Sequence, residues 1–201
     1  DVTLAAAGTI NLENNANAAS LTIQTAANIQ NVTTSGAQNY NGNTVISSAA
    51  AIESTGGNII FAAGTTLSVN ADTTITVPAS KYIDFNGSTS VSGKLSTAGS
   101  GLAKFNASIT GLNELETQAV QINCAAISTG GDQTYNGATE ITVNTELSAP
   151  ANKLILFNAA ISGTVNLKTS GAAVAEFKNT VNIANLETQV AKINTTSTIT
   201  S

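Results

Sequence analysis

Side chains able to do acid–base or nucleophilic chemistry are few in this chain of 201 residues. It has no histidine and a single cysteine, Cys124. Without an imidazole, the chain lacks the usual base that activates a serine or cysteine nucleophile. Cys124 follows Ile122 by two positions, so we expect a buried, structural thiol on the same inward strand face. This inventory disfavours an enzyme.

Carboxylates could serve a polysaccharide lyase, in which a basic side chain works beside acidic residues that hold calcium. The chain contains no arginine, and Glu116 recurs as Glu187 within an internal repeat, which favours a solvated face over a site. Gly130-Gly131-Asp132 lacks the full glycine and aspartate spacing of a calcium-binding β-roll repeat. The nearest acidic pairs are Asp72 with Asp84 and Glu114 with Glu116. We expect no catalytic residue, no metal site and no cofactor.

Charge limits the possible partners. The net charge is −5, only 9% of residues are charged, and all seven basic residues are lysines without a cluster. A nucleic-acid surface needs such clusters to replace the counterions of the phosphates, so neither nucleic acid nor an anionic membrane is expected as a partner. No apolar run approaches the roughly 20 residues that cross a bilayer, so we expect no membrane insertion. Because 42% of residues are hydrophobic, the chain should nevertheless fold.

Short strands are the secondary structure that the sequence predicts. Runs of three to five residues alternate β-branched or apolar residues with small polar ones, as in Leu21-Thr22-Ile23 and Thr74-Ile75-Thr76-Val77. Glycine, asparagine, serine and alanine separate these runs. Alternation with period two predicts strands and the intervening residues predict turns, while no segment carries a helical stripe. The predicted class is all-β.

Long-period self-similarity separates a solenoid from a sandwich. Residues 78–123 match residues 150–194, with Phe85 and Phe105 recurring as Phe157 and Phe177, which gives an internal repeat of about 72 residues. Aromatic residues within a unit recur mostly at about 20–24 residues, which is one solenoid coil. We therefore expect residues 1–201 to form a single β-helix rod with three short parallel strands per coil and a narrow apolar channel. The same repeat predicts that Phe85 stacks near Phe105, and Phe157 near Phe177, inside it.

A nine-residue motif occurs twice, as TSGAQNYNG at 34–42 and TGGDQTYNG at 129–137. We interpret it as a structural corner and stacking element. Its glycines would supply backbone angles that other residues resist, its asparagines would tolerate the left-handed region, and its tyrosines would stack at equivalent positions. A hairpin turn at Asn-Gly and a pair of ligand-binding loops are the alternatives. The residues concerned are Gly36, Tyr40, Asn41, Gly42, Gly131, Tyr135, Asn136 and Gly137.

This motif, followed by STGGNIIFAAGTTL at 54–67, resembles the repeats of large filamentous-haemagglutinin-like exoproteins of bacteria and of related autotransporter passengers. The resemblance covers most of the chain. It implies a right-handed parallel β-helix (β-solenoid) of about 20–24 residues per coil. It also implies display outside the cell, with a role in adhesion, biofilm formation or toxin presentation. It implies no catalytic residues, and the secretion-domain motif of that family is absent here.

Together these observations predict a structural or adhesive β-helix segment of a bacterial surface or secreted fibrous protein. Its expected partner is a second copy stacked end to end, because neither end shows a cap, or a receptor or glycan on a host or neighbouring cell. A secreted carbohydrate-binding or carbohydrate-active β-helix is the alternative. Ice binding through Thr-x-Thr rows is a weaker one, since Glu146 occupies the position in the second copy that is equivalent to Thr74.

Overall fold

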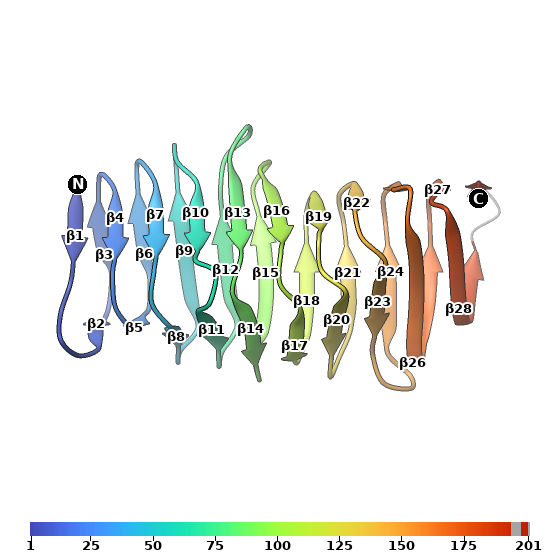
Figure 1. The fold of residues 1–201 in the computed structure, drawn as a ribbon, viewed down its shortest axis with the longest axis horizontal. Helices are drawn as coiled ribbons and strands as arrows, with labels where there is room; N and C mark the ends of the chain where they lie inside the picture. Colours follow the sequence, from blue (N-terminus) through green and yellow to red (C-terminus); the bar gives the residue numbers. More distant parts are fainter. Residues whose placement is uncertain (194–197, 201) are drawn as a thin grey trace.

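The computed structural model describes residues 1–193 and 198–200, and it is a parallel β-solenoid of about ten turns. The predicted all-β class is confirmed, with no helix among the described residues. Each turn passes through three faces, and successive turns stack along one axis, with the two ends of the chain at opposite ends of the rod (Figure 1). At roughly 4.8 Å per turn, the stack is about 48 Å long.

Face A is an 11-stranded parallel sheet that contains one strand from each turn. Its strands, in spatial order, are β1 (Val2–Leu4), β4 (Leu21–Ile23), β7 (Gln38–Tyr40), β10 (Ile59–Phe61), β13 (Tyr82–Phe85), β16 (Leu102–Phe105), β19 (Val120–Ile122), β22 (Thr139–Ile141), β25 (Ile161–Ser162), β27 (Val181–Asn182) and β29 (Ile199–Thr200).

Faces B and C are the other two walls. Face B consists of β2 (Ile10–Leu12), β5 (Ala27–Ile29), β8 (Thr44–Ile46), β11 (Thr66–Val69), β14 (Ser88–Val91), β17 (Ile109–Leu112), β20 (Ala126–Thr129) and β23 (Thr145–Ser148). Face C consists of β3 (Ala16–Ala18), β6 (Val32–Thr34), β9 (Ala50–Ser54), β12 (Thr73–Thr76), β15 (Lys94–Ala98), β18 (Glu114–Thr117), β21 (Gln133–Tyr135) and β24 (Leu154–Phe157). Two long strands, β26 (Asn166–Phe177) and β28 (Asn185–Ile193), bend at the corner and belong to both faces.

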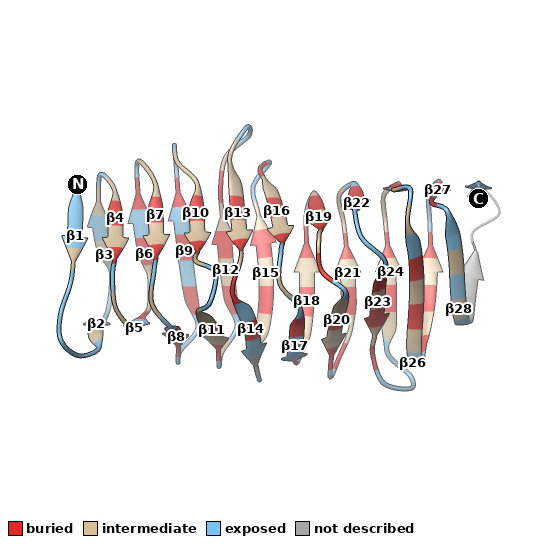
Figure 2. Ribbon diagram, in the orientation of Figure 1, coloured by how far each residue is buried: buried red, intermediate tan, exposed pale blue. Residues whose placement is uncertain are grey.

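Alternation along most strands places every second side chain in the channel, although β17 interrupts it with a register shift between Thr110 and Leu112. On β4, for example, Leu21 and Ile23 are buried while Thr22 between them is half-buried on the outside. Figure 2 shows the same banding of buried and exposed residues on strand after strand. Each turn contributes only a few apolar side chains to the channel, so the fold needs few large hydrophobic residues. Together these side chains form a continuous hydrophobic core along the axis.

Turn length varies more than the aromatic spacing predicted. Thr22 and its register partner Asn39 in the next turn are 17 residues apart in sequence. Asn58 and Tyr82, which are hydrogen-bonded between neighbouring turns, are 24 residues apart. Most strands have only three to five residues, so the corners account for most of the difference. One long corner contains Pro78, where the Lys81 backbone N–H donates to the Pro78 carbonyl and Ser80 adopts a φ of 64°.

The buried aromatic rings form two separate stacks. On face A, Tyr40, Phe61, Phe85 and Phe105 lie one above another, and the ring centroids of Phe85 and Phe105 are 5.1 Å apart. On face C, Tyr135, Phe157 and Phe177 do the same, with Phe157 and Phe177 5.4 Å apart and nearly parallel. All seven rings are at most 2% exposed.

The internal repeat is out of phase with the turns. Phe85 lies on face A, whereas its repeat partner Phe157 lies on face C, because β24 is the eleventh strand after β13 and three strands complete one turn. The repeat therefore advances the chain by three turns and two thirds of another. The sequence repeat therefore does not contain a whole number of solenoid turns. The final residue of the second copy, Asn194, lies outside the described residues.

Candidate functional site

The first copy of the nine-residue motif builds a buried polar network around Gln38. The Tyr40 hydroxyl donates to Gln38 Oε1 at 2.8 Å, and Gln38 Nε2 donates to Thr34 Oγ1 at 3.1 Å and to the Glu53 carbonyl of the next turn at 2.6 Å. Thr34 Oγ1 in turn donates to the Gly36 carbonyl. Every polar group of the Gln38 amide thus has a partner, which a fully buried amide requires.

The second copy reproduces this network around Gln133. The Tyr135 hydroxyl donates to Gln133 Oε1 at 2.9 Å, and Gln133 Nε2 donates to Thr129 Oγ1 at 3.2 Å and to the Ser148 carbonyl at 2.8 Å. The first network joins faces C and A, and the second joins faces B and C. Burial raises the pKa of both tyrosines well above the usual value. The motif is therefore a corner-and-stack element, and its tyrosines are not available to a ligand.

The glycines of the motif are required for a different reason from the predicted one. None of Gly36, Gly42, Gly131 and Gly137 has a φ in the left-handed region, so that part of the prediction was wrong. A Cβ on Gly42 would lie 2.1 Å from the Thr25 carbonyl group of the turn below, and those at the other three positions 2.3–2.8 Å from backbone atoms. These glycines allow close packing between successive turns.

The asparagines of the motif also differ from the prediction. Neither Asn41 nor Asn136 adopts a positive φ. Instead, the Asn41 side-chain amide donates to Gln24 at 3.1 Å, and that of Asn136 donates to Glu116 at 3.0 Å while its oxygen accepts from Asn158 at 2.8 Å. The hairpin alternative is also excluded, because every pair that the strands beside these residues form is parallel. These side chains connect turns along the axis.

Side chains of Asn and Asp also make a second kind of hydrogen bond between turns, which the sequence did not predict. At six corners of the described part of the chain, a side-chain oxygen of Asn or Asp accepts a hydrogen bond from a backbone N–H at or next to the start of a strand in the next turn. Each of these side chains therefore satisfies a backbone donor near the start of a strand. A polar residue of short side chain just before a strand was the signal that could have found them. The accepting residues are Asn31, Asn43, Asn58, Asp72, Asp132 and Asn144.

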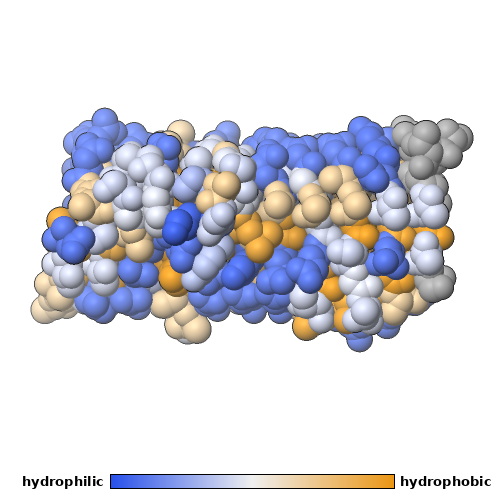
Figure 3. Space-filling model, turned by 90° about the horizontal axis from the view of Figure 1, so that it is seen from above, coloured by the Kyte–Doolittle hydropathy of each residue, from blue (hydrophilic) through white to orange (hydrophobic). Residues whose placement is uncertain are grey.

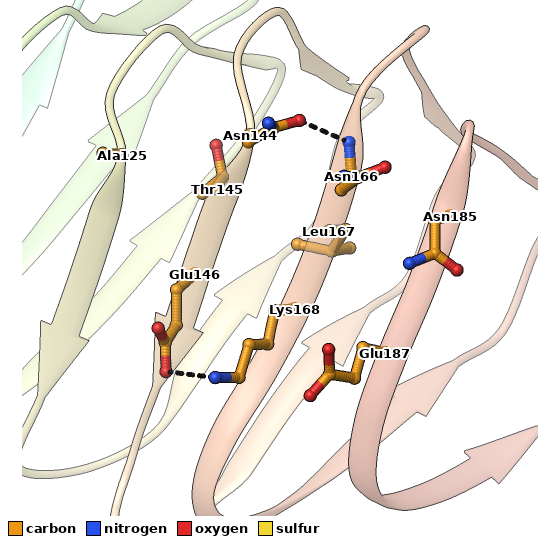
Figure 4. Close-up of a pocket in the computed structure, with 9 residues that line it drawn as sticks. All are labelled: Ala125, Asn144, Thr145, Glu146, Asn166, Leu167, Lys168, Asn185 and Glu187. Atoms are coloured by element: carbon orange, nitrogen blue, oxygen red, sulfur yellow. Dashed lines mark hydrogen bonds and ion pairs between the residues drawn. The ribbon is translucent and has the colours of Figure 1, made fainter.

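A surface hollow lies on face B near the corner with face A, and Figure 4 shows it. It has a volume of about 330 Å³ and crosses β23, β26 and β28. Two rows of side chains border it, one of amides and one of charged groups, with Thr145 and Leu167 between them. The amide row is Asn144, Asn166 and Asn185, and the charged row is Glu146, Lys168 and Glu187.

The charged row alternates in sign along the rod. Lys168 Nζ lies 3.6 Å from Glu146 Oε1, and both side chains are more than two-fifths exposed, so the pair contributes little stability. The Ser170 hydroxyl donates to Glu146, and with Lys168 it lowers the pKa of that carboxyl. Carboxylate oxygens and amides at this spacing can form hydrogen bonds with hydroxyl groups of a ligand. The two rows include no nucleophile with an adjacent base.

The remaining candidate groups show no catalytic arrangement within the described residues. Cys124 is buried, and burial raises the pKa of its thiol to about 11, the opposite of what a nucleophile needs. Lys94 bridges Glu114 and Glu116 on face C, at 3.9 and 2.6 Å. Asp72 and Asp84 lie apart, one at a corner and one on face A. No cluster of three or more metal-binding side chains occurs in the part of the chain that the structure describes.

Comparisons with known proteins add no relative: no family model, no curated protein and no solved structure matches the chain. The described residues also contain no helix long and apolar enough to span a membrane. The Thr-x-Thr pattern does not continue as a row, since Thr74 lies between Ala51 and Ser96 and Thr76 between Glu53 and Ala98.

Proposed function

We propose that this chain is a structural, adhesive segment of a bacterial surface or secreted fibrous protein, acting outside the cell. The observation that carries the proposal is the continuous stack of turns, in which buried networks and aromatic columns hold an elongated shape and leave three long faces exposed. A rod of this kind can hold a binding surface away from its anchor. Its composition of small, weakly charged side chains supports a scaffold more than a reaction centre.

The two terminal turns support association with a second copy. Within the described residues, strands β1, β2 and β3 each pair with one neighbour, and so does β29 at the other end. Val2 and Ile199 are 40% and 39% exposed, and both lie on face A in the row that faces the channel. Stacking two copies head to tail would bury both side chains and pair the open strand edges. Because this contact does not close, it extends into a fibre.

Sedimentation velocity over a concentration series tests this association. We expect the mean mass to increase with concentration, and Val2→Lys or Ile199→Lys to return the chain to monomer. Val143→Lys is the matched control, because Val143 is also an exposed large hydrophobic residue, at 38%, but lies at a corner within the rod. A chain that stays monomeric at high concentration, or a control variant that dissociates equally, would refute end-to-end stacking.

The hollow of Figure 4 favours carbohydrate binding as a second candidate. Its amide row repeats at the spacing of the turns, so a chain of hydroxyl-bearing units lying along the rod could meet one amide per turn. A screen of the purified chain against neutral and charged oligosaccharides, repeated with Asn166→Ala and Asn185→Ala, tests it. Binding that survives both substitutions would exclude this hollow as the site.

A further inference from the structure

The two copies of the internal repeat contain the same tight turn at a corner of the solenoid. The side chains around the two tight turns form different surfaces. In the first copy Lys81 N donates to the Pro78 carbonyl at 3.2 Å, and in the second Lys153 N donates to the Pro150 carbonyl at the same distance. The third residue of each turn, Ser80 or Asn152, has a φ of 64°. The side chains beside the turns differ: Tyr82, Asp84 and Lys104 in the first copy correspond to Leu154, Leu156 and Glu176 in the second.

A surface hollow lies beside the first of these tight turns. Its volume is about 280 Å³, and it lies between the turn at 78–81 and the bend at 99–101. Figure 3 views the rod onto these corners, where hydrophobic and hydrophilic atoms lie side by side near the middle. Leu102 and Ala119 supply the apolar part, and hydroxyls come from Ser80, Ser100 and Tyr82.

Lys104 is the best-placed cation of this hollow. Its ammonium lies 4.0 Å from the centroid of the Tyr82 ring, a cation–π contact that fixes its position. It also lies 4.0 Å from Asp84 Oδ1, which is too far for a hydrogen bond. Asp84 Oδ1 is itself buried without a hydrogen-bond partner among the described residues.

The ammonium of Lys104 is therefore positioned while its three donors remain available to a ligand. Lys81 also lines the hollow, so its lining contains two lysines and no carboxylate. This local excess of positive charge occurs in a chain whose net charge is −5. An anionic group is the ligand that this arrangement would attract, and the surrounding hydroxyls and apolar floor suit the ring that carries it.

We propose that the hollow between residues 78–82 and 99–104 binds an acidic saccharide, with its sulfate or carboxylate on Lys104 and Lys81 and its ring against Tyr82 and Leu102. This goes beyond the structural role of the rod and does not depend on it. This hollow is also distinct from the candidate carbohydrate site of Figure 4, which lies on face B.

The test is a titration of the isotope-labelled chain, followed by the shifts of its backbone amide signals. The probes are N-acetylglucosamine 6-sulfate, glucuronate, uncharged N-acetylglucosamine and inorganic sulfate. We expect the two acidic sugars to shift the signals of Ser100, Gly101 and Lys104 but not that of Gly171, the equivalent of Gly99 in the second copy. A response to the sulfated sugar alone would assign sulfate as the acidic group, and a response to glucuronate alone would assign carboxylate.

Substitutions then separate charge from shape. Lys104→Met should weaken binding about tenfold or more, because it removes charge-assisted hydrogen bonds. Tyr82→Leu, which copies the second turn, should also weaken it, whereas Asp84→Asn should tighten it by removing the competing carboxylate. Lys153→Met is the control and should have no effect. Unchanged far-ultraviolet circular dichroism and urea midpoints would show that the variants fold.

Several results would overturn the proposal. Equal binding of the uncharged sugar would show that the cations do not select the ligand. Equal binding of inorganic sulfate and the sulfated sugar would show an anion site that does not recognise a saccharide. Unchanged affinity in folded Lys104→Met, or no shift with either acidic sugar, would exclude the site itself.

Discussion

Tyr40 and Tyr135 donate the same hydrogen bond, to the glutamine two residues before each, on different faces of the rod. The donor–acceptor distances are 2.8 Å to Gln38 and 2.9 Å to Gln133. Each tyrosine is also the first ring of an aromatic stack that continues toward the C-terminus. The polar network and the stack therefore form one element, in which the amide fixes the ring on which the next turn packs.

Breaking this network should cost more than the loss of an ordinary surface hydrogen bond. Tyr135→Phe leaves Gln133 Oε1 buried without its donor, and we expect the free energy of unfolding to fall by about 1–3 kcal/mol. Urea denaturation measures this change. Tyr82→Phe, at a half-buried tyrosine outside the channel, is the control and should stay within about 0.5 kcal/mol of the parent. Equal effects at the two sites would contradict a stabilising role for the network.

Glycine at the corners should matter where successive turns approach and not elsewhere. Gly42→Ala places a Cβ 2.1 Å from backbone atoms of Thr25, so we expect destabilisation of about 1–3 kcal/mol or more. Gly8→Ala meets nothing within 4 Å and should leave the thermal midpoint unchanged. If Gly42→Ala were as stable as Gly8→Ala, the close approach of the two turns would not be present in solution.

The centre of the second aromatic stack should be sensitive to truncation. Phe157 lies between Tyr135 and Phe177 and is 1% exposed, so Phe157→Ala should lower the free energy of unfolding by about 3–5 kcal/mol. Phe157→Leu, which keeps most of the volume, should cost much less. A small effect of the alanine variant in guanidinium denaturation would show that neighbouring turns collapse into the cavity.

Alkaline pH should destabilise the rod. Burial raises the pKa of Cys124 to about 11 from an ordinary value of 9.0, and it raises those of Tyr40 and Tyr135 above 10.0. In the unfolded chain these groups ionise at their ordinary values, whereas in the folded chain they stay neutral. Stability should therefore be nearly constant between pH 7 and about 9 and decrease above that, as denaturation midpoints across pH 7–11 can show.

The thiol gives a direct check of the same burial. Because Cys124 is 5% exposed and its pKa is raised, a thiol-specific chromogenic reagent at pH 8 should react slowly with the folded chain and rapidly in denaturant. Cys124→Ala should remove the reaction in both states. Fast labelling of the folded chain would place this thiol at the surface.

The sequence was enough to predict the fold class, since strand alternation and the long-period repeat both follow from how a solenoid buries side chains. The Phe85–Phe105 and Phe157–Phe177 pairs could be placed because each pair is one turn apart within a repeat. The strands could not be assigned to faces from the sequence. The number of residues in a repeat does not give the number of strands in it, because the corners differ in length. Nothing in the aromatic spacing showed that Phe85 and Phe157 lie in different stacks.

The roles of the corner residues were also beyond the sequence. The sequence alone does not distinguish a glycine that avoids a steric clash with the preceding turn from a glycine that adopts a left-handed backbone conformation. Gly42 does the first, while Gly64, at a φ of 75°, does the second. The oxygens of Asn43 and Asp72 accept hydrogen bonds from residues 23 and 22 positions later, which no local motif signals.

A repeat that advances by an incomplete turn determines how the rod meets its surroundings. Glu116 stands on face C and Glu187 on face B, and the lysines of the two proline turns, Lys81 and Lys153, lie on different edges. When such a segment is repeated, the equivalent surface groups of successive copies lie on different faces around the solenoid axis. A neighbour approaching from one side meets the first copy, and a neighbour from another side meets the second. Repeats of a whole number of turns would instead give a one-sided ribbon, able to engage a single surface.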